Sequence, residues 1–453
     1  MASLKLNVPP GRRRGAAGAC VVAVLASAAA SADLFNGDED WSNAWASLIG
    51  HAGGLLMVSF VALLCLKCLR ELRSPGPAGE SRLAVPAGKF TTAEKCVVYF
   101  GALALQFFML YLAFLTNGRG FSAPEFWHAL LIRFTSTDAI HYLYLAEHGY
   151  QSSGAKANLV VFYPLYPSLI WLFKLILGSY VAAGLFVSWA CWGGACVSML
   201  ELAAQRYDRR CAALAALLLA LYPFSFFSIG VFTESVFLLL STQCLLRIEK
   251  RQWLAVGVLG CLAALCRTPG VLLIFPAVYV WLLARKNKER DLRSLYLLLI
   301  PAGFGGYLLL NKIVAGRWTA YVAYQKAPPW YQSARWISAN LIQQYGMAQQ
   351  YPGLAKFIYM PELVLYFIVL GLLFYGLLSA APPHVLLYGG AYLGMCYLSS
   401  WLISGPRYLF GCLPLFLLLA RPRSRMWRAL IPMVSAILLF CYAVYYMQGQ
   451  AIM

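Results

Sequence analysis

The chain has 453 residues, of which 61% are hydrophobic and only 12% are charged. A soluble globular protein carries roughly a quarter charged residues, so the composition excludes a soluble enzyme and indicates a protein built for a lipid bilayer. The formal net charge of +19 at pH 7 would suit a nucleic-acid-binding protein, but the basic residues cluster in short loops between apolar runs. This is the positive-inside pattern, which orients membrane helices, so no nucleic-acid partner is expected.

The N-terminal region combines a basic start with a short apolar stretch. Residues 11–35 read GRRRGAAGACVVAVLASAAASADLF, a pattern that fits a cleaved signal peptide and a membrane anchor equally well. The role of residues 15–33 therefore stays open between these two. An apolar span at about 45–66 and a basic loop with Pro and Gly at 67–94 follow. Residues 1–94 are thus expected to form a signal or anchor segment, an extra transmembrane helix and a cytoplasmic linker.

Apolar runs of about 20 residues recur along the rest of the chain, and each can cross roughly 30 Å of hydrocarbon. Further spans are expected at about 95–116, 181–202, 211–229, 232–248, 253–268, 271–284, 294–311, 358–379, 384–403, 408–420 and 428–447. The sequence thus predicts an all-α polytopic membrane protein with about 11 to 13 transmembrane helices. Two polar stretches, 117–158 and 312–357, are too long for turns, and the basic loops place both on the extracytoplasmic side.

One apolar segment conflicts with this topology. Residues 160–178, VVFYPLYPSLIWLFKLILG, could span a membrane, but the basic loops that follow would then all face outward. We therefore interpret this segment as a helix in the outer interface, and a true span that breaks the positive-inside rule is the alternative. The domain prediction is a catalytic membrane module over 95–311, with a first outer loop at 117–180, and then a second outer loop and C-terminal helices over 312–453.

A polar cluster occurs in the first outer loop. Residues 135–151, TSTDAIHYLYLAEHGYQ, place Asp138, His141 and His148 in apolar surroundings. On a helix Asp138, His141 and Tyr142 share one face, because residues three and four positions apart are neighbours. An aspartate beside a histidine can deprotonate an alcohol as a general base, so Asp138 and His141 are catalytic candidates. The simpler alternatives are a helix cap for Asp138 and interfacial aromatic positions for the histidines.

Three short motifs place further charges at span ends on the same side. FTES, CRTPG and SGPRY carry Glu234, Arg267 and Arg407 at the edge of the hydrocarbon, where ionisable residues are costly and usually functional. Glu234 is expected to assist catalysis, and the two guanidinium groups are suited to a phosphate. Alternatively, Glu234 is an acid at a helix N-terminus and the arginines reach toward lipid headgroups. A base and a phosphate clamp at a lipid interface predict transfer of a group from a lipid phosphate to a hydroxyl.

The second outer loop contains AYQKAPPWYQ, in which Lys326, Trp330 and Tyr331 either shape an acceptor pocket or form an interfacial aromatic belt. No metal site is predicted, although the outer carboxylates permit a divalent cation. The thirteen cysteines lie nearly all within or beside apolar runs, where cysteine behaves as a small buried hydrophobe. No cofactor is therefore assigned from the sequence.

Five stretches occur along the chain in this order: TDAIHYLYLAEHGY, VFYPLYPSLI, YPFSFFSIGVFTESVFLLLS, LCRTPGVLL and SGPRYLFGCLPLF. The set lies within roughly residues 95–420 and resembles the PIG-V family of mannosyltransferases, which add the second mannose to glycosylphosphatidylinositol. The resemblance implies a membrane-embedded GT-C glycosyltransferase fold, a polyprenyl-phosphate or dolichyl-phosphate mannose donor, Asp138 as the base and inversion of the anomeric centre. One departure is Thr137, where family members commonly have Trp. The residues expected to bind the substrate or its phosphate are Arg267, Arg407, Tyr142, His148, Tyr163 and Lys326.

The sequence therefore predicts an inverting glycosyltransferase that moves mannose from a polyprenyl-phosphate donor to a hydroxyl of a glycolipid, on the lumenal or extracytoplasmic side. Its expected partners are the lipid-linked donor, a glycolipid acceptor, membrane lipids and, as an open alternative, a small membrane subunit. The expected location is a bacterial or archaeal plasma membrane or the endoplasmic reticulum membrane. Two other functions stay open: a transporter or flippase of a lipid-linked sugar, which would carry charges near the bilayer midplane, and a non-catalytic subunit of a glycolipid-assembly complex.

Overall fold

The computed structural model describes residues 41–74, 88–117, 122–287, 291–379, 381–400, 402 and 404–450. This part of the chain is all-α, and its one β-type contact is an isolated antiparallel bridge between Ala334 and Ser399. The signal or anchor segment expected at 15–33 lies outside the described residues, as does the middle of the basic loop at 67–94.

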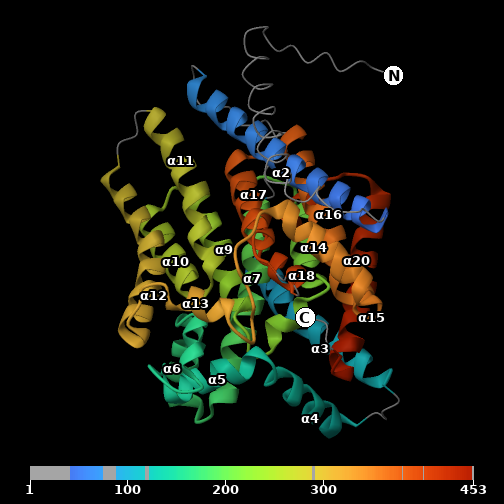
Figure 1. The fold of residues 1–453 in the computed structure, drawn as a ribbon. Coiled ribbons are helices and arrows are strands. Elements are labelled where there is room, and N and C mark those ends of the chain that lie inside the picture. Colours follow the sequence, from blue (N-terminus) through green and yellow to red (C-terminus); the bar gives the residue numbers. More distant parts are fainter. Residues whose placement is uncertain are drawn as a thin grey trace.

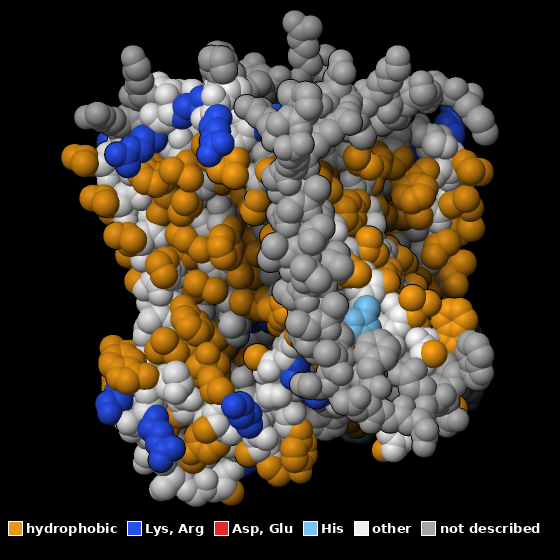
Figure 2. Space-filling model, turned by 45° about the horizontal axis from the view of Figure 1, so that its top comes forward, with side chains coloured by type: hydrophobic (Ala, Val, Ile, Leu, Met, Phe, Trp, Pro, Cys, Tyr) orange, Lys and Arg blue, Asp and Glu red, His pale blue; other side chains and the backbone are white. Residues whose placement is uncertain are grey.

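Seven helices of the described chain are long and apolar enough to cross a membrane, which confirms a multi-pass membrane protein. They are α2 (Trp41–Arg73), α3 (Thr92–Leu115), α7 (Tyr180–Ala204), η4 (Thr268–Leu273) with α11 (Ile274–Lys286), η5 (Leu292–Leu298) with α12 (Leu299–Ala315), α15 (Pro352–Leu354) and η6 (Ala355–Tyr359) with α16 (Met360–Leu378), and α20 (Arg425–Gln448). Figure 2 shows their surface as a broad hydrophobic belt, with lysine and arginine side chains near its two rims. The spans expected at about 45–66, 95–116, 181–202, 271–284, 294–311, 358–379 and 428–447 fall on these seven helices.

Shorter helices pack among these spans. They are α8 (Arg209–Ala220), α9 (Glu234–Glu249), α10 (Trp253–Cys266), α17 (Pro383–Tyr397), α18 (Gly405–Leu409) and α19 (Pro414–Leu419). The spans expected at 211–229 and 408–420 are therefore not continuous helices. Pro223 follows the end of α8, where the chain turns into the short helix η3 (Ser225–Ile229), and residues 410–413 separate α18 from α19, which begins at Pro414. These breaks are buried among neighbouring helices, where irregular backbone is tolerated at membrane depth.

The helix α10, which ends just before Arg267, packs very closely on α12. A methyl group added at Gly257 would lie 2.1 Å from the carbonyl oxygen of Tyr296, and one added at Gly303 would lie 2.4 Å from that of Cys261. Small residues at such positions let two membrane helices approach backbone to backbone. This packing fixes the end of α10 and therefore the start of the CRTPG motif.

Three helices of the first outer loop form a layer at one end of the bundle: α4 (Ala123–Phe134), α5 (Asp138–His148) and α6 (Leu165–Leu177), with η2 (Ala157–Val161) between the last two (Figure 1). The helix α6 has 13 residues, so it is about 20 Å long and too short to cross roughly 30 Å of hydrocarbon. Its Leu175 and Ile176 side chains are 63% and 77% exposed, which suits contact with lipid at the interface. The structure therefore favours the interfacial interpretation of 160–178. We call this end of the bundle the outer face.

The second outer loop holds α13 (Ala320–Lys326) and α14 (Ile337–Gln350), joined by an extended stretch that includes Tyr331. The helix α14 packs on the first half of α2, where Gly50 and Gly53 make room for Ile342 and Leu341. The first half of α2 therefore lies on the outer side. Its last turn, with Arg70 and Arg73, lies at the opposite end, in agreement with the positive-inside pattern.

Candidate active site

The helix α5 begins at Asp138, directly after an unusual backbone conformation. Thr137 has φ 55° and ψ −126°, and its side chain does not cap the helix. A positive φ is rare for a β-branched residue and costs on the order of 1–3 kcal/mol. Such strain persists only where the surrounding structure holds the residue in place. Here the backbone conformation of Thr137 sets the direction in which the chain enters α5 at Asp138.

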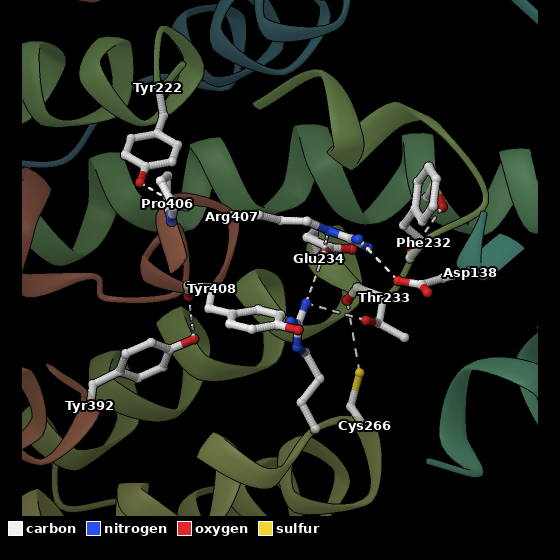
Figure 3. A network of polar contacts seen from close by, with 12 residues as sticks. Asp138, Tyr222, Phe232, Thr233, Glu234, Cys266, Tyr392, Pro406, Arg407 and Tyr408 are labelled. Atoms are coloured by element: carbon white, nitrogen blue, oxygen red, sulfur yellow. Dashed lines mark hydrogen bonds and ion pairs between the residues drawn. The ribbon is translucent and has the colours of Figure 1, made fainter. Parts of the chain in front are cut away.

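Three charged side chains from distant parts of the chain meet beside Asp138 (Figure 3). The guanidinium of Arg407 donates from Nη1 to Oδ2 of Asp138 at 3.0 Å and from Nε to Oε1 of Glu234 at 2.6 Å. The same Glu234 oxygen lies 2.8 Å from Nη1 of Arg267, which also donates to Oγ1 of Thr233 at 3.4 Å. We call Asp138, Glu234, Arg267 and Arg407 the ion-pair network. The outer ends of α5, α9, α10 and α18 thus converge, as the sequence predicted.

The four side chains of the ion-pair network differ in their exposed fraction. The side chain of Asp138 is 39% exposed, whereas the side chains of Arg267, Arg407 and Glu234 are 18%, 5% and 2% exposed. Two carboxylates and two guanidinium groups balance in charge, which such burial requires, because an unpaired buried ion is very costly. The second carboxylate oxygen of Glu234, Oε2, is buried without a hydrogen-bond partner among the described residues. Asp138 is therefore the accessible end of the network.

Aromatic rings surround the guanidinium groups. The centre of the Arg407 guanidinium lies 4.5 Å from the ring centroid of Phe227 and 4.9 Å from that of Phe232, and the centre of the Arg267 guanidinium lies 5.8 Å from that of Tyr408. Rings at these distances attract a cation and exclude water from it. The aromatic residues of YPFSFFSIGVFTES thus line the Arg407 side chain, a role that the sequence analysis did not assign to them.

The SGPRY segment that carries Arg407 is held by buried hydrogen bonds. Gly405 donates its backbone N–H to Oε1 of Glu362 at 2.9 Å, Tyr392 donates its hydroxyl to the carbonyl of Tyr408 at 3.0 Å, and Tyr222 donates to the carbonyl of Pro406. Glu362 lies in α16 and is fully buried. This carboxylate was not singled out in the sequence, where it sits in an ordinary apolar span.

Tyr142 and His141 lie next to the ion-pair network on α5. Tyr142 is buried, interacts with the side chain of Thr233 and packs edge-on against Phe162, at a centroid distance of 5.1 Å. Burial raises the pKa of Tyr142, as does the nearby charge of Asp138, so its hydroxyl stays protonated. Burial also lowers the pKa of His141, although Asp138 opposes this shift, and the ring is therefore mostly neutral at pH 7. No hydrogen bond joins His141 to Asp138 among the described contacts, and Nδ1 of His141 is buried without a partner there.

Tyr163 connects the outer layer to the CRTPG motif. Its hydroxyl lies 2.8 Å from Oγ1 of Thr268, the residue after Arg267, and its ring stacks on Tyr307 with a centroid distance of 3.9 Å. Burial raises the pKa of Tyr163 above its ordinary value, so this group too is a neutral donor. The contact places Tyr163 beside the ion-pair network, where it positions the Arg267 turn.

Two predicted site residues are not part of this assembly. His148 stacks on Tyr144 at the far end of α5, with a centroid distance of 4.5 Å, and its side chain is 49% exposed. Lys326 is exposed at the end of α13 and makes no hydrogen bond or ion pair with the ion-pair network. Within the described residues, no group of three or more His, Cys, Asp or Glu side chains is placed to hold a metal ion.

The ion-pair network could act as a base beside a fixed positive charge. Asp138 can take up a proton from a hydroxyl at the outer face, and Arg407 next to it can stabilise negative charge on a neighbouring group. Both arginines are already engaged by carboxylates, so a phosphate would meet Arg407 at its Asp138 side, the more accessible end. The arrangement fits proton removal and anion stabilisation at one membrane surface.

A family model described as dolichyl-phosphate-mannose-protein mannosyltransferase matches residues 163–310, a region that includes Glu234 and Arg267. The chain is also similar to the structure of the archaeal oligosaccharyltransferase AglB from Archaeoglobus fulgidus in complex with an inhibitory peptide and a dolichol-phosphate. That similarity covers 87% of this chain and 56% of AglB, at 12% sequence identity and a TM-score of 0.37. No curated protein matches the sequence. About a third of the chain thus resembles a membrane mannosyltransferase family, and the chain spans just over half the length of the solved structure.

Proposed function

We propose that this protein is a membrane-embedded, inverting glycosyltransferase of the GT-C class that transfers mannose from a polyprenyl-phosphate donor to a hydroxyl of a glycolipid. The observation that carries the proposal is the ion-pair network at the outer face, with Asp138 as its accessible member and Arg407 beside it. The match of residues 163–310 to a mannosyltransferase family supports the same reaction class. The PIG-V-like order of motifs is the basis for proposing a glycolipid acceptor.

In this mechanism Asp138 takes the proton of the acceptor hydroxyl while the hydroxyl oxygen attacks the anomeric carbon of the donor sugar. The bond between that carbon and the phosphate oxygen breaks, and the polyprenyl phosphate leaves with the electron pair. Attack from the face opposite the leaving group inverts the anomeric centre. Arg407 stabilises the charge that develops on the phosphate, since its guanidinium contacts Asp138, the accessible member of the network.

Glu234 has a positioning role in this scheme rather than direct contact with the substrate. Its side chain is only 2% exposed, and one of its oxygens accepts from both arginines. It therefore fixes the distance between Arg267 and Arg407. Tyr142, Tyr163 and Thr233 support the same arrangement from the outer layer and from the FTES motif.

The test is sugar transfer by purified protein in lipid, with polyprenyl-phosphate mannose and a panel of glycolipid acceptors. Asp138→Asn should lower turnover by about 10²- to 10⁴-fold, the contribution typical of a general base. Glu147→Gln is a matched control, because Glu147 is an exposed acid at the other end of the same helix. Wild-type turnover in Asp138→Asn would overturn the proposal. Movement of the donor lipid across the bilayer without sugar transfer would point to a transporter instead.

A further inference from the structure

A groove with both apolar and polar lining residues lies on the second outer loop, away from the ion-pair network. It has a volume of about 480 Å³ and is lined by Tyr331, Ser333, Arg335, Gln343, Met347 and Ser400. No carboxylate is among these residues, so the groove does not favour a cation. None of these residues takes part in the mechanism proposed above.

The walls of the groove are tied together by hydrogen bonds. Ser333 and Ser400 exchange three contacts: the Ser333 N–H donates to Oγ of Ser400 at 2.9 Å, the Ser400 N–H donates to the carbonyl of Ser333 at 2.7 Å, and the two hydroxyl oxygens lie 3.0 Å apart. The backbone N–H of Arg335 donates to the carbonyl of Leu398 at 2.8 Å, next to the bridge between Ala334 and Ser399. The groove is therefore a fixed feature of the two segments rather than a gap between loose loops.

The groove is joined to the ion-pair network in two ways. Ser400 precedes the SGPRY segment by four residues. The hydrogen-bonded pair of Ser333 and Ser400 is therefore close in sequence to the segment that carries Arg407. Gln332, between two lining residues, places its side chain against the hydroxyl of Tyr408, whose ring faces Arg267. A molecule in the groove would thus be connected to Arg267 through two side chains, those of Gln332 and Tyr408.

The lining groups suit a carbohydrate. The Tyr331 ring is 55% exposed and held at a positive φ of 47°, and it offers a flat apolar surface of the kind that sugar rings contact. Gln343 can donate and accept hydrogen bonds, and the Arg335 guanidinium has several donors, of which one serves Oε1 of Gln343 at 3.0 Å. A small-molecule site typically combines an aromatic surface with a few placed polar groups in this way.

We propose that this groove binds the sugar headgroup of the acceptor, an inference that rests on the proposed function. The donor's anomeric carbon and phosphate must lie at Asp138 and Arg407, where the reaction occurs. The groove is set back from that point behind Gln332 and Tyr408, so it takes the part of the acceptor that does not react. Lys326, which the sequence suggested for a substrate pocket, is not among its lining residues.

The test compares Tyr331→Ala and Arg335→Gln with two matched controls from the same outer region, Tyr351→Ala and Arg317→Gln, whose side chains are also exposed but lie outside the groove. Acceptor KM, donor KM and kcat are measured for each. We expect the acceptor KM to rise about tenfold in the two groove variants, the equivalent of losing one good contact, while the donor KM and the controls stay at wild-type values. An unchanged acceptor KM, or a rise in donor KM alone, would refute the groove assignment.

A second measurement does not depend on activity. Saturation-transfer NMR with soluble mannobiose should give a signal with wild-type protein that Tyr331→Ala removes and Tyr351→Ala retains. Displacement of mannobiose by inorganic phosphate would show an anion site and overturn the inference. Wild-type protein that binds mannobiose but transfers no sugar would refute the proposed reaction and leave the groove standing. If wild-type protein transfers sugar and both groove variants keep wild-type kinetics, the proposed reaction would stand and the groove assignment would be refuted.

Discussion

Nη1 of Arg407 lies 3.0 Å from Oδ2 of Asp138, although 269 residues separate the two along the chain. This pair joins the most accessible and one of the most buried members of the ion-pair network, since the same guanidinium also binds Glu234. A change at Arg407 is therefore expected to affect both the proposed chemistry at Asp138 and the stability of the interior.

Replacing Arg407 should separate these two effects. Arg407→Ala leaves Glu234 buried with one cation fewer, so the free energy of unfolding should fall by about 3–5 kcal/mol. Arg407→Lys keeps the charge but cannot bind two carboxylates in the same fork, so it should fold and lose most transfer activity. Thermal unfolding in detergent and turnover in lipid check both outcomes. Full activity in Arg407→Lys would mean that charge alone is sufficient at this position.

Glu362 should act as a positioning residue through the SGPRY backbone. Glu362→Ala leaves the N–H of Gly405 buried without an acceptor, at a cost of about 1–3 kcal/mol, and lets the segment shift. Glu362→Gln retains an oxygen that can accept this hydrogen bond, so it should restore both stability and kcat. Parallel measurement of kcat and KM gives the decisive readout. A purely structural role would lower the amount of folded protein in Glu362→Ala without lowering kcat per folded molecule.

His141 should make the protein less stable in mild acid. Burial lowers its pKa in the folded state, so the unfolded chain binds the proton more tightly. The unfolded state therefore gains as the pH falls through the ordinary histidine pKa of 6.5, and the melting temperature should drop from pH 7.5 to pH 5.5. His141→Gln removes this titration, so its melting temperature should fall less over the same interval. Equal slopes in the two proteins would exclude His141 as a source of the pH dependence.

The sequence was informative where hydrophobicity alone decides the structure. Seven of the apolar runs coincide with the seven helices that are long enough to cross a membrane, and the charge of the loops places 160–178 at the outer face, where α6 lies. The same topology predicts that Asp138, Glu234, Arg267 and Arg407 gather at one end. Their convergence is visible in the structure.

The pairing within that cluster could not be predicted in the same way. Which oxygen meets which guanidinium depends on contacts over 173 and 269 residues of sequence, and no local pattern encodes them. His148 is the same residue type as His141 and lies about two turns further along the same helix, but only the structure shows that it stacks on Tyr144, away from the ion-pair network. The role of Glu362 could not be predicted either. A single carboxylate inside an apolar span does not indicate a function until its partner, the N–H of Gly405, is known.

The interruptions after α8 and between α18 and α19 have a consequence for how the protein is made. At these interruptions short turn hydrogen bonds and side-chain contacts replace the regular pattern of an α-helix, so we expect that neither segment enters the bilayer as an independent helix. Each needs neighbouring helices already in place to cover it, as α8 is covered by α7 and α19 by α16. The SGPRY segment and its arginine are therefore expected to reach their final position late in biogenesis, after the lipid-facing helices have been inserted.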